Sequence, residues 1–188
     1  GFYWRENRIS HIGDEHIIIA DAKRGDIGNT GLHYANAFFN HFRCDAITVS
    51  PYMGKESIEP FITDSSKGTF VLCRTSNESS TFIQEDIFSK VISVCEQLND
   101  KQNIGLVVGA TNDEALKDVR NLSDLPFLIP GIGAQGGSLE NVLKINGNHL
   151  DTTLINISRG IIFAGNKDHD SIRSKTNDYL SQMRGFNG

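Results

Sequence analysis

The segment IIIADAKRGDIGNT, residues 17–30, runs from three isoleucines directly into a series of charged side chains. We expect a strand that ends at Asp21, with Lys23 two positions later and Asp26 in the following loop. Because alternate residues of a strand share a face, Asp21 and Lys23 are expected on the same side of it. Charged groups are costly to bury, so this set is either a solvated cluster or charge assembled for chemistry.

Composition excludes several classes of protein. A length of 188 residues fits one ordinary domain, so residues 1–188 are expected to form a single domain. The net charge of -5 argues against a nucleic-acid binder, which normally carries a basic face. No apolar run reaches the roughly 20 residues of a membrane helix, and the first residues lack the apolar region of a signal peptide. We therefore expect a cytoplasmic protein with reduced cysteines.

Short apolar runs alternate with helical patterns along the chain. The runs are continuous rather than alternating, which is typical of strands covered on both faces of a parallel sheet. The expected strands are residues 16–21, 45–50, 69–75, 104–111, 126–133 and 152–158.

Helices are expected between these strands. Thr111 with Glu114 has the spacing of a capping box, and Ser138 is a second expected N-cap. One apolar stripe includes Leu32, and the last helix carries Ile172, Tyr179 and Met183. Six β-α units in a row predict an α/β fold with a parallel sheet, either open or closed as a (β/α)₈ barrel.

Unusual residues follow the strands, where parallel α/β folds place their sites. Ser76 follows the third expected strand, and Arg159 with Gly160 follows the last. Residues 129–138, IPGIGAQGGS, form a glycine-rich loop whose backbone N–H groups are expected to be available to a phosphate. The loop also matches G-x-G-x-x-G, but too little chain follows it for a dinucleotide-binding half. We therefore expect a phosphate site, with Arg159 as a bidentate partner.

These motifs together resemble the orotidine 5′-phosphate decarboxylase family, in its longer bacterial type. DAKRGDIGNT carries the family's D-x-K-x-x-D signature, and the likeness continues to about residue 165 through DAITVSPYMGKES, VLCRTSN, GLVVGAT, PGIGAQGG and NISRGIIFA. The resemblance implies a (β/α)₈ TIM barrel, a homodimer with shared active sites, and no metal or organic cofactor. The implied reaction is decarboxylation of orotidine 5′-monophosphate to UMP, in pyrimidine biosynthesis.

The resemblance also implies roles for individual residues. Lys23 would be the proton donor, Asp21 its partner beside the substrate carboxylate, and Asp26 a third catalytic residue that reaches a neighbouring subunit's site together with Thr30. The substrate-binding residues would be Ser76 for the pyrimidine amide and, for the phosphate, Gln135, Gly136, Arg159 and Gly160.

The sequence also departs from the family. About six β-α units are visible, and the first two barrel strands, with a ribose-binding aspartate and a second lysine, have no counterpart. The chain is therefore expected to be an N-terminally incomplete barrel. Two alternatives stay open: a Mg²⁺-dependent sugar-phosphate decarboxylase or aldolase on the same barrel, and an inactive truncated homologue.

Overall fold

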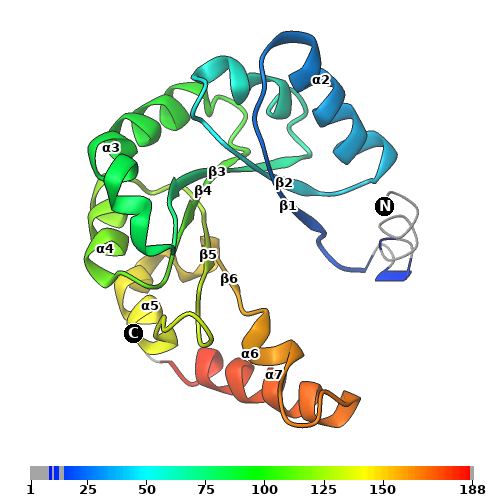
Figure 1. Cartoon of the computed structure of the whole chain (residues 1–188), viewed down its shortest axis with the longest axis vertical. Helices are drawn as coiled ribbons and strands as arrows, with labels where there is room; N and C mark the ends of the chain where they lie inside the picture. Colours follow the sequence, from blue (N-terminus) through cyan, green and yellow to red (C-terminus); the bar gives the residue numbers. More distant parts are fainter. Residues whose placement is uncertain (1–8, 10, 13–14, 187–188) are drawn as a thin grey trace. The chain divides into compact units, whose positions relative to one another are not determined.

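The computed structural model describes residues 9, 11–12 and 15–186, and strands alternate with helices throughout this part (Figure 1). The strands are β1 (Ile19–Arg24), β2 (Ala46–Val49), β3 (Gly68–Arg74), β4 (Ile104–Val108), β5 (Phe127–Pro130) and β6 (Thr153–Asn156). They form one six-stranded sheet in chain order, and the pairs β1–β2, β2–β3 and β5–β6 are parallel. The prediction of an α/β fold with a parallel sheet is confirmed.

The helices follow the strands as the apolar stripes predict. The α-helices are α2 (Gly28–Asn36), α3 (Thr81–Leu98), α4 (Asp113–Leu122), α5 (Leu139–Asn146), α6 (Arg159–Ile162) and α7 (His169–Arg184). A π-helical turn, η1 (Ala37–His41), extends α2, and short 3-10 turns are η2 (Lys55–Ser57), η3 (Glu59–Phe61), η4 (Glu78–Ser80) and η5 (Gly147–Thr152). None of the helices in the described ranges is both long and apolar enough to cross a membrane.

The chain forms two compact units. Unit 1 comprises the described residues up to Leu72 together with Lys90–Leu106, and unit 2 comprises Cys73–Ser89 and the described residues from Val107 onward. Each unit has its own buried apolar side chains, which are Ile47, Val49, Ile58, Phe61, Val71, Ile104 and Leu106 in unit 1, and Val108, Leu116, Val119, Phe127, Ile129 and Val142 in unit 2.

Burial on both faces holds for the middle strands only. Every residue of β2 and β4 is buried, whereas β1 and β6 alternate between exposed and half-buried side chains. β1 and β6 are the first and last strands in the sheet order, so each has a sheet neighbour on one side only. Continuous apolar runs in the sequence therefore overstate how deeply these two strands are buried.

The bounds of β1 correct the prediction of a strand over 16–21. Pairing with β2 begins at Ile19 opposite Ala46, and Ile17 before it is 74% exposed. The strand instead continues through the charged residues to Arg24, whose carbonyl accepts the N–H of Ser50. Backbone pairing, which an apolar run does not reveal, decides where this strand ends.

The expected capping box at the start of α4 is also wrong. Asn112, not Thr111, is the N-cap, and its side-chain oxygen accepts the N–H of Ala115 at 3.0 Å. The Thr111 hydroxyl instead donates to the carbonyl of Ser76 at 2.9 Å. Ser138 caps α5 as predicted, by accepting the N–H of Asn141.

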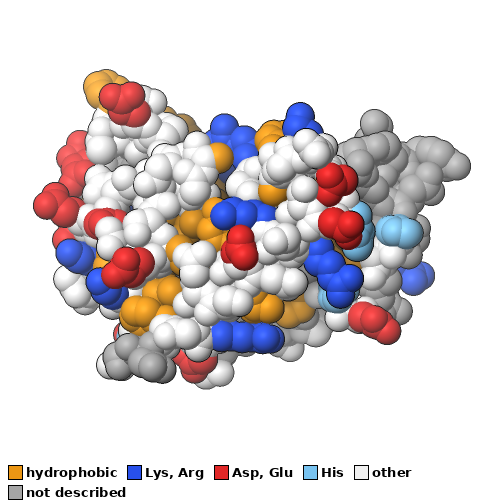
Figure 2. All heavy atoms as spheres, turned by 90° about the horizontal axis from the view of Figure 1, so that it is seen from below, with side chains coloured by type: hydrophobic (Ala, Val, Ile, Leu, Met, Phe, Trp, Pro, Cys, Tyr) orange, Lys and Arg blue, Asp and Glu red, His pale blue; other side chains and the backbone are white. Residues whose placement is uncertain are grey.

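Acidic and basic side chains are interspersed on the face of the molecule shown in Figure 2. The mixture of both signs agrees with the small negative net charge of the sequence.

Candidate active site

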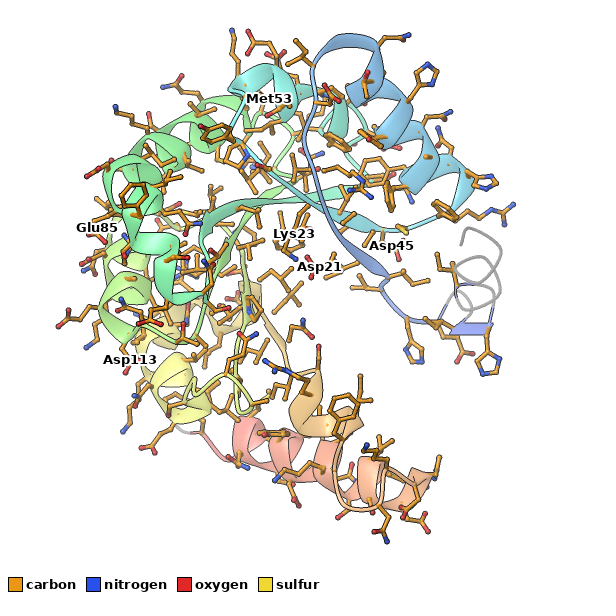
Figure 3. All side chains as sticks on the ribbon, viewed as in Figure 1. Asp21, Lys23, Asp45, Met53, Glu85 and Asp113 are labelled. Carbon is orange, nitrogen blue, oxygen red and sulfur yellow. The ribbon has the colours of Figure 1, made fainter. Side chains whose placement is uncertain are left out.

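The charged residues of the opening segment form a tight pair at the end of β1. The ammonium Nζ of Lys23 lies 2.5 Å from Oδ1 of Asp21, and both side chains are about half exposed. Figure 3 shows the two side chains next to each other on β1. Asp21 and Lys23 therefore do lie together, as their spacing predicts.

The backbone at this pair is irregular. Lys23 has φ +47°, a left-handed conformation that costs a non-glycine residue about 1–2 kcal/mol, and the register with β2 shifts between Ala20 and Arg24. Strain of this kind is concentrated at functional sites, where surrounding contacts hold it in place.

Thr48 of β2 supplies those contacts. Its hydroxyl oxygen accepts the backbone N–H of Lys23 at 2.9 Å, and the hydroxyl donates to Oδ1 of Asp21 at 3.0 Å. Thr48 is 1% exposed, so the hydroxyl is shielded from competing water. One side chain thus fixes both the strained backbone of Lys23 and the carboxylate of Asp21. Sequence reasoning did not single out Thr48, although it lies within the quoted segment DAITVSPYMGKES, because its place in a strand of apolar residues gives no sign of its two hydrogen bonds.

Asp26 and Thr30 lie further along unit 1. The Asp26 carboxylate accepts the backbone N–H of Ile27 at 2.9 Å, and Thr30 is exposed in the first turn of α2. The three charged residues Asp21, Lys23 and Asp26 thus do not act as one array here. Lys23 forms an ion pair with Asp21, whereas the Asp26 carboxylate accepts a backbone N–H. Ile27 and Leu32, on either side of Thr30 in the sequence, are 56% and 54% exposed. This corrects the expectation that Leu32 faces the core.

Unit 2 brings Ser76 and Gln135 together. The Ser76 hydroxyl donates to Oε1 of Gln135 at 2.8 Å, although 59 positions separate them in the sequence. Gly109 permits this approach, because a Cβ there would lie 2.7 Å from the backbone N and Cα of Ser76. Two of the predicted substrate-binding residues are thus in direct contact.

The glycine-rich loop is held by its own backbone. The N–H of Gly133 donates to the carbonyl of Gly137, that of Gly136 to Gly133, and that of Gly137 to Gly131. Three glycines adopt positive φ (Gly131, Gly133 and Gly136), which only glycine adopts without strain. The expectation that the loop's N–H groups are available to a phosphate is therefore wrong for Gly133, Gly136 and Gly137.

Arg159 and Gly160 begin the short helix α6, one residue after Ser158, and the Arg159 side chain is exposed. Among the described residues, no three His, Cys, Asp or Glu side chains are grouped so that they could hold a metal ion.

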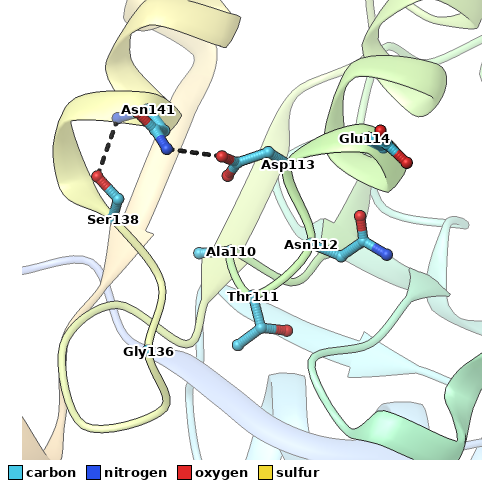
Figure 4. Close-up of a pocket in the computed structure, with 8 residues that line it drawn as sticks. All are labelled: Ala110, Thr111, Asn112, Asp113, Glu114, Gly136, Ser138 and Asn141. Carbon is cyan, nitrogen blue, oxygen red and sulfur yellow. Dashed lines mark hydrogen bonds between the residues drawn. The ribbon is translucent and has the colours of Figure 1, made fainter.

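A pocket of about 340 Å³ opens beside the same loop in unit 2 (Figure 4). Gly136 is the one predicted site residue in its wall, and the N-caps of α4 and α5 contribute to it. Asp113 accepts the side-chain N–H of Asn141 at 2.6 Å, and Glu114 adds a second carboxylate. These negative charges disfavour a phosphate in this pocket. The full lining is Ala110, Thr111, Asn112, Asp113, Glu114, Gly136, Ser138 and Asn141.

Comparison with known proteins gives consistent matches. Residues 7–171 match the family described as "Orotidine 5'-phosphate decarboxylase / HUMPS family". Proteins named orotidine 5′-phosphate decarboxylase from Natronomonas pharaonis and Dehalococcoides mccartyi are 46% and 47% identical to the chain over 173 and 165 residues. These alignments cover 86% and 81% of the chain but only 64% and 61% of the relatives' length.

Solved structures agree with the sequence matches. The OMP decarboxylase of Leishmania donovani has a TM-score of 0.85 and 36% identity, with 96% of this chain and 72% of that chain covered. The UMP synthase of the same organism has a TM-score of 0.87 and 36% identity, with 100% and 44% covered. The family description joins two names, orotidine 5′-phosphate decarboxylase and HUMPS. The relatives from Natronomonas pharaonis and Dehalococcoides mccartyi carry the first of these names.

Proposed function

The chain belongs to the orotidine 5′-phosphate decarboxylase / HUMPS family, and from this we propose that its protein converts orotidine 5′-monophosphate to UMP and CO₂. The observation that carries the proposal is the Asp21–Lys23 pair, held by Thr48 at a strained backbone position. Relatives named for this activity, at 46–47% identity, support it.

Lys23 is the proposed proton donor. When the bond between C6 of the pyrimidine and the carboxylate breaks, CO₂ leaves and the electron pair stays on C6. An ammonium group beside C6 stabilises this charge as it develops and then transfers a proton to the carbon. The resulting neutral amine regains its proton from water, so the lysine is unchanged at the end of the cycle.

Asp21 is proposed to have two effects. Its carboxylate, 2.5 Å from the Nζ of Lys23, orients the ammonium through the ion pair. Next to the substrate carboxylate, the same negative charge would favour loss of CO₂, because the repulsion disappears as the neutral product forms.

Substrate recognition is proposed to lie in unit 2. Ser76 would bind the pyrimidine amide, while Gln135 and Arg159 bind the phosphate with Gly136 and Gly160 beside them. The hydrogen bond between Ser76 and Gln135 supports this assignment, because it links the residue proposed to bind the pyrimidine to a residue proposed to bind the phosphate. Binding energy from the phosphate would then serve to order groups around the reacting carbon.

Two features of assembly are part of the proposal. The six parallel strands are proposed to be part of a (β/α)₈ barrel, and the protein is proposed to be a homodimer in which Asp26 and Thr30 reach the partner's site. The exposed apolar side chains of Ile27 and Leu32 beside Thr30 support an interface at α2, because a contact there would remove them from water.

The test is the reaction itself. The full-length protein is incubated with orotidine 5′-monophosphate labelled at the carboxylate, and labelled CO₂ and UMP are measured with and without EDTA. We expect equal amounts of both products and no effect of EDTA. Turnover of a sugar phosphate with loss of activity in EDTA, and no reaction with the nucleotide, would instead identify the metal-dependent branch of the family.

A further inference from the structure

Tyr179 of α7 lies against two segments of unit 2 that the proposed function assigns to the phosphate. A Cβ built on Gly133 of the glycine-rich loop would lie 3.0 Å from the Tyr179 hydroxyl, and one built on Gly160 would lie at the same distance. The hydroxyl oxygen is therefore placed between the loop that carries Gln135 and the turn that carries Arg159.

The space for a side chain at position 160 is limited by this contact. Gly133 has φ +75°, so its backbone alone favours glycine, but Gly160 has no such conformation. What crowds a side chain at position 160 is the Tyr179 hydroxyl at 3.0 Å and Ile157 Cγ2 at 3.3 Å, whereas the nearest ring carbon of Tyr179 is at 3.8 Å. The hydroxyl, and not the ring, is thus the atom that approaches the turn most closely.

The charged side chains nearest Tyr179 on α7 are Lys175 and Asp178, whose Nζ and Oδ2 lie 3.9 Å apart. Lys175, one turn earlier on α7, has its ammonium 5.0 Å from the centre of the Tyr179 ring. A phenolic hydroxyl can donate one hydrogen bond, and among the described residues the Tyr179 hydroxyl forms none to another protein group. A ligand anion that lies between Gly133 and Gly160 would be within reach of this hydroxyl as an acceptor.

We propose that Tyr179 is a further phosphate-binding residue, whose hydroxyl donates to the ligand's phosphate between Gly133 and Gly160. This inference rests on the proposed function for the identity of the nucleotide, but the anion site itself does not depend on the reaction. The α7 helix then belongs to the binding site, although Tyr179 lies outside the motifs of the family resemblance, which end at about residue 165.

The test compares wild type with Tyr179→Phe in the full-length protein, by calorimetry with UMP, uridine and inorganic phosphate. A hydrogen bond to a charged group is worth enough that its loss should weaken UMP and phosphate binding about tenfold or more. Uridine affinity and thermal stability should not change, because the ring and its packing remain. Tyr34→Phe, which removes the hydroxyl of a half-buried tyrosine in α2, is the matched control and should bind as wild type.

A second pair of variants tests the geometry. Gly160→Ala should weaken UMP binding both by displacing the hydroxyl and by crowding the phosphate beside Gly160, so the double variant Gly160→Ala/Tyr179→Phe should lose less affinity than the sum of the two single losses. If the losses of UMP affinity in the two single variants add up fully in the double variant, the contact between Tyr179 and Gly160 is contradicted.

The outcomes separate this inference from the proposed function. If wild type prefers UMP to uridine and Tyr179→Phe binds UMP as tightly as wild type, the role of Tyr179 is overturned. The proposed function is not affected by that result. Phosphate binding that depends on Tyr179, in a protein that does not convert orotidine 5′-monophosphate, would support Tyr179 and reject the function. A wild-type protein that binds neither UMP nor phosphate would overturn both.

Discussion

Lys23 combines a charged side chain with a backbone conformation that only its surroundings make tolerable. The left-handed φ of +47° costs about 1–2 kcal/mol, and the Thr48 hydroxyl offsets part of that cost by accepting the Lys23 N–H. The same hydroxyl donates to Asp21. Loss of this one oxygen should therefore disturb two proposed catalytic groups without touching either.

The change Thr48→Val tests this. We expect turnover to fall roughly 10- to 100-fold with little change in UMP affinity, because small misplacements of catalytic groups are costly to rate. Thr69→Val is the matched control, since Thr69 is also a fully buried strand threonine of unit 1 and its hydroxyl donates to the carbonyl of Phe61 at 2.8 Å. Both variants should lose about 1–2 kcal/mol of stability. Equal turnover in the two would contradict the positioning role of Thr48.

Cys95 gives a prediction on pH. Burial, with a smaller contribution from the charge of Glu96, raises the pKa of its thiol to about 12 from an ordinary value of 9.0. The unfolded chain therefore loses this proton first, so the contribution of Cys95 to stability is complete below pH 9 and declines as pH rises towards 12. The destabilisation caused by Cys95→Ala, measured by denaturant unfolding, should be largest at pH 8 and smaller at pH 11. A constant difference would show that the thiol titrates normally.

At the scale of elements, apolar runs predicted the strands well and their ends poorly. Strand β2 lies within the predicted residues 45–50, and every one of its residues is buried. The end of β1 depends on the Thr48 hydroxyl of β2 and on the N–H of Ser50, the residue that follows β2. The start of α4 depends on Ser76, because its carbonyl accepts a hydrogen bond from the Thr111 hydroxyl. Asn112, and not Thr111, then caps the helix. These partners are distant in sequence, so local patterns do not reveal them.

Arg120 joins α4 to its neighbours in a way that the sequence did not indicate. It is 8% exposed and donates to the side-chain oxygen of Asn146 in α5 and to the carbonyls of Ser123 and Leu125. Its guanidinium carbon also lies 3.4 Å from the centre of the Phe127 ring. Burial lowers its pKa to about 10, against the opposing charge of Asp124, so Arg120 stays protonated at neutral pH.

The change Arg120→Ala should therefore lower the free energy of unfolding by about 3 kcal/mol or more, because several buried acceptors lose their donor. Arg173→Ala, at an exposed position of α7, should change it by no more than about 0.5 kcal/mol. Denaturant unfolding of the two variants measures the difference. A small effect of Arg120→Ala would mean that water replaces the guanidinium at these acceptors.

For the whole molecule, the residues of the candidate site could be predicted in part. The rule that parallel strands place sites after their C-terminal ends grouped Ser76 with Gln135, which are in contact. The same rule gave no sign of Thr48 within a strand or of Tyr179 on the last helix. Both act through a single hydroxyl whose neighbours come from other elements, and such contacts carry no periodicity or motif.

The proposed dimer is tested by mixing subunits. If Asp26 completes the partner's site, inactive Lys23→Ala subunits combined with inactive Asp26→Asn subunits should regain activity, because one of the two sites in each heterodimer has both groups intact. Mass spectrometry of the intact complexes confirms that heterodimers form. Heterodimers without activity would show that Asp26 and Lys23 serve the same subunit's site.

The central claim is that Lys23 carries the chemistry. The most direct measurement is single-turnover release of labelled CO₂ from orotidine 5′-monophosphate by full-length wild type and Lys23→Ala, with UMP affinity measured in parallel. Lys117→Ala, at an exposed position of α4, controls for loss of a positive charge. We predict that Lys23→Ala loses CO₂ release by several orders of magnitude while its UMP affinity stays within about tenfold of wild type, because the ammonium acts in the transition state. Release of CO₂ by Lys23→Ala at the rate of Lys117→Ala would contradict the account.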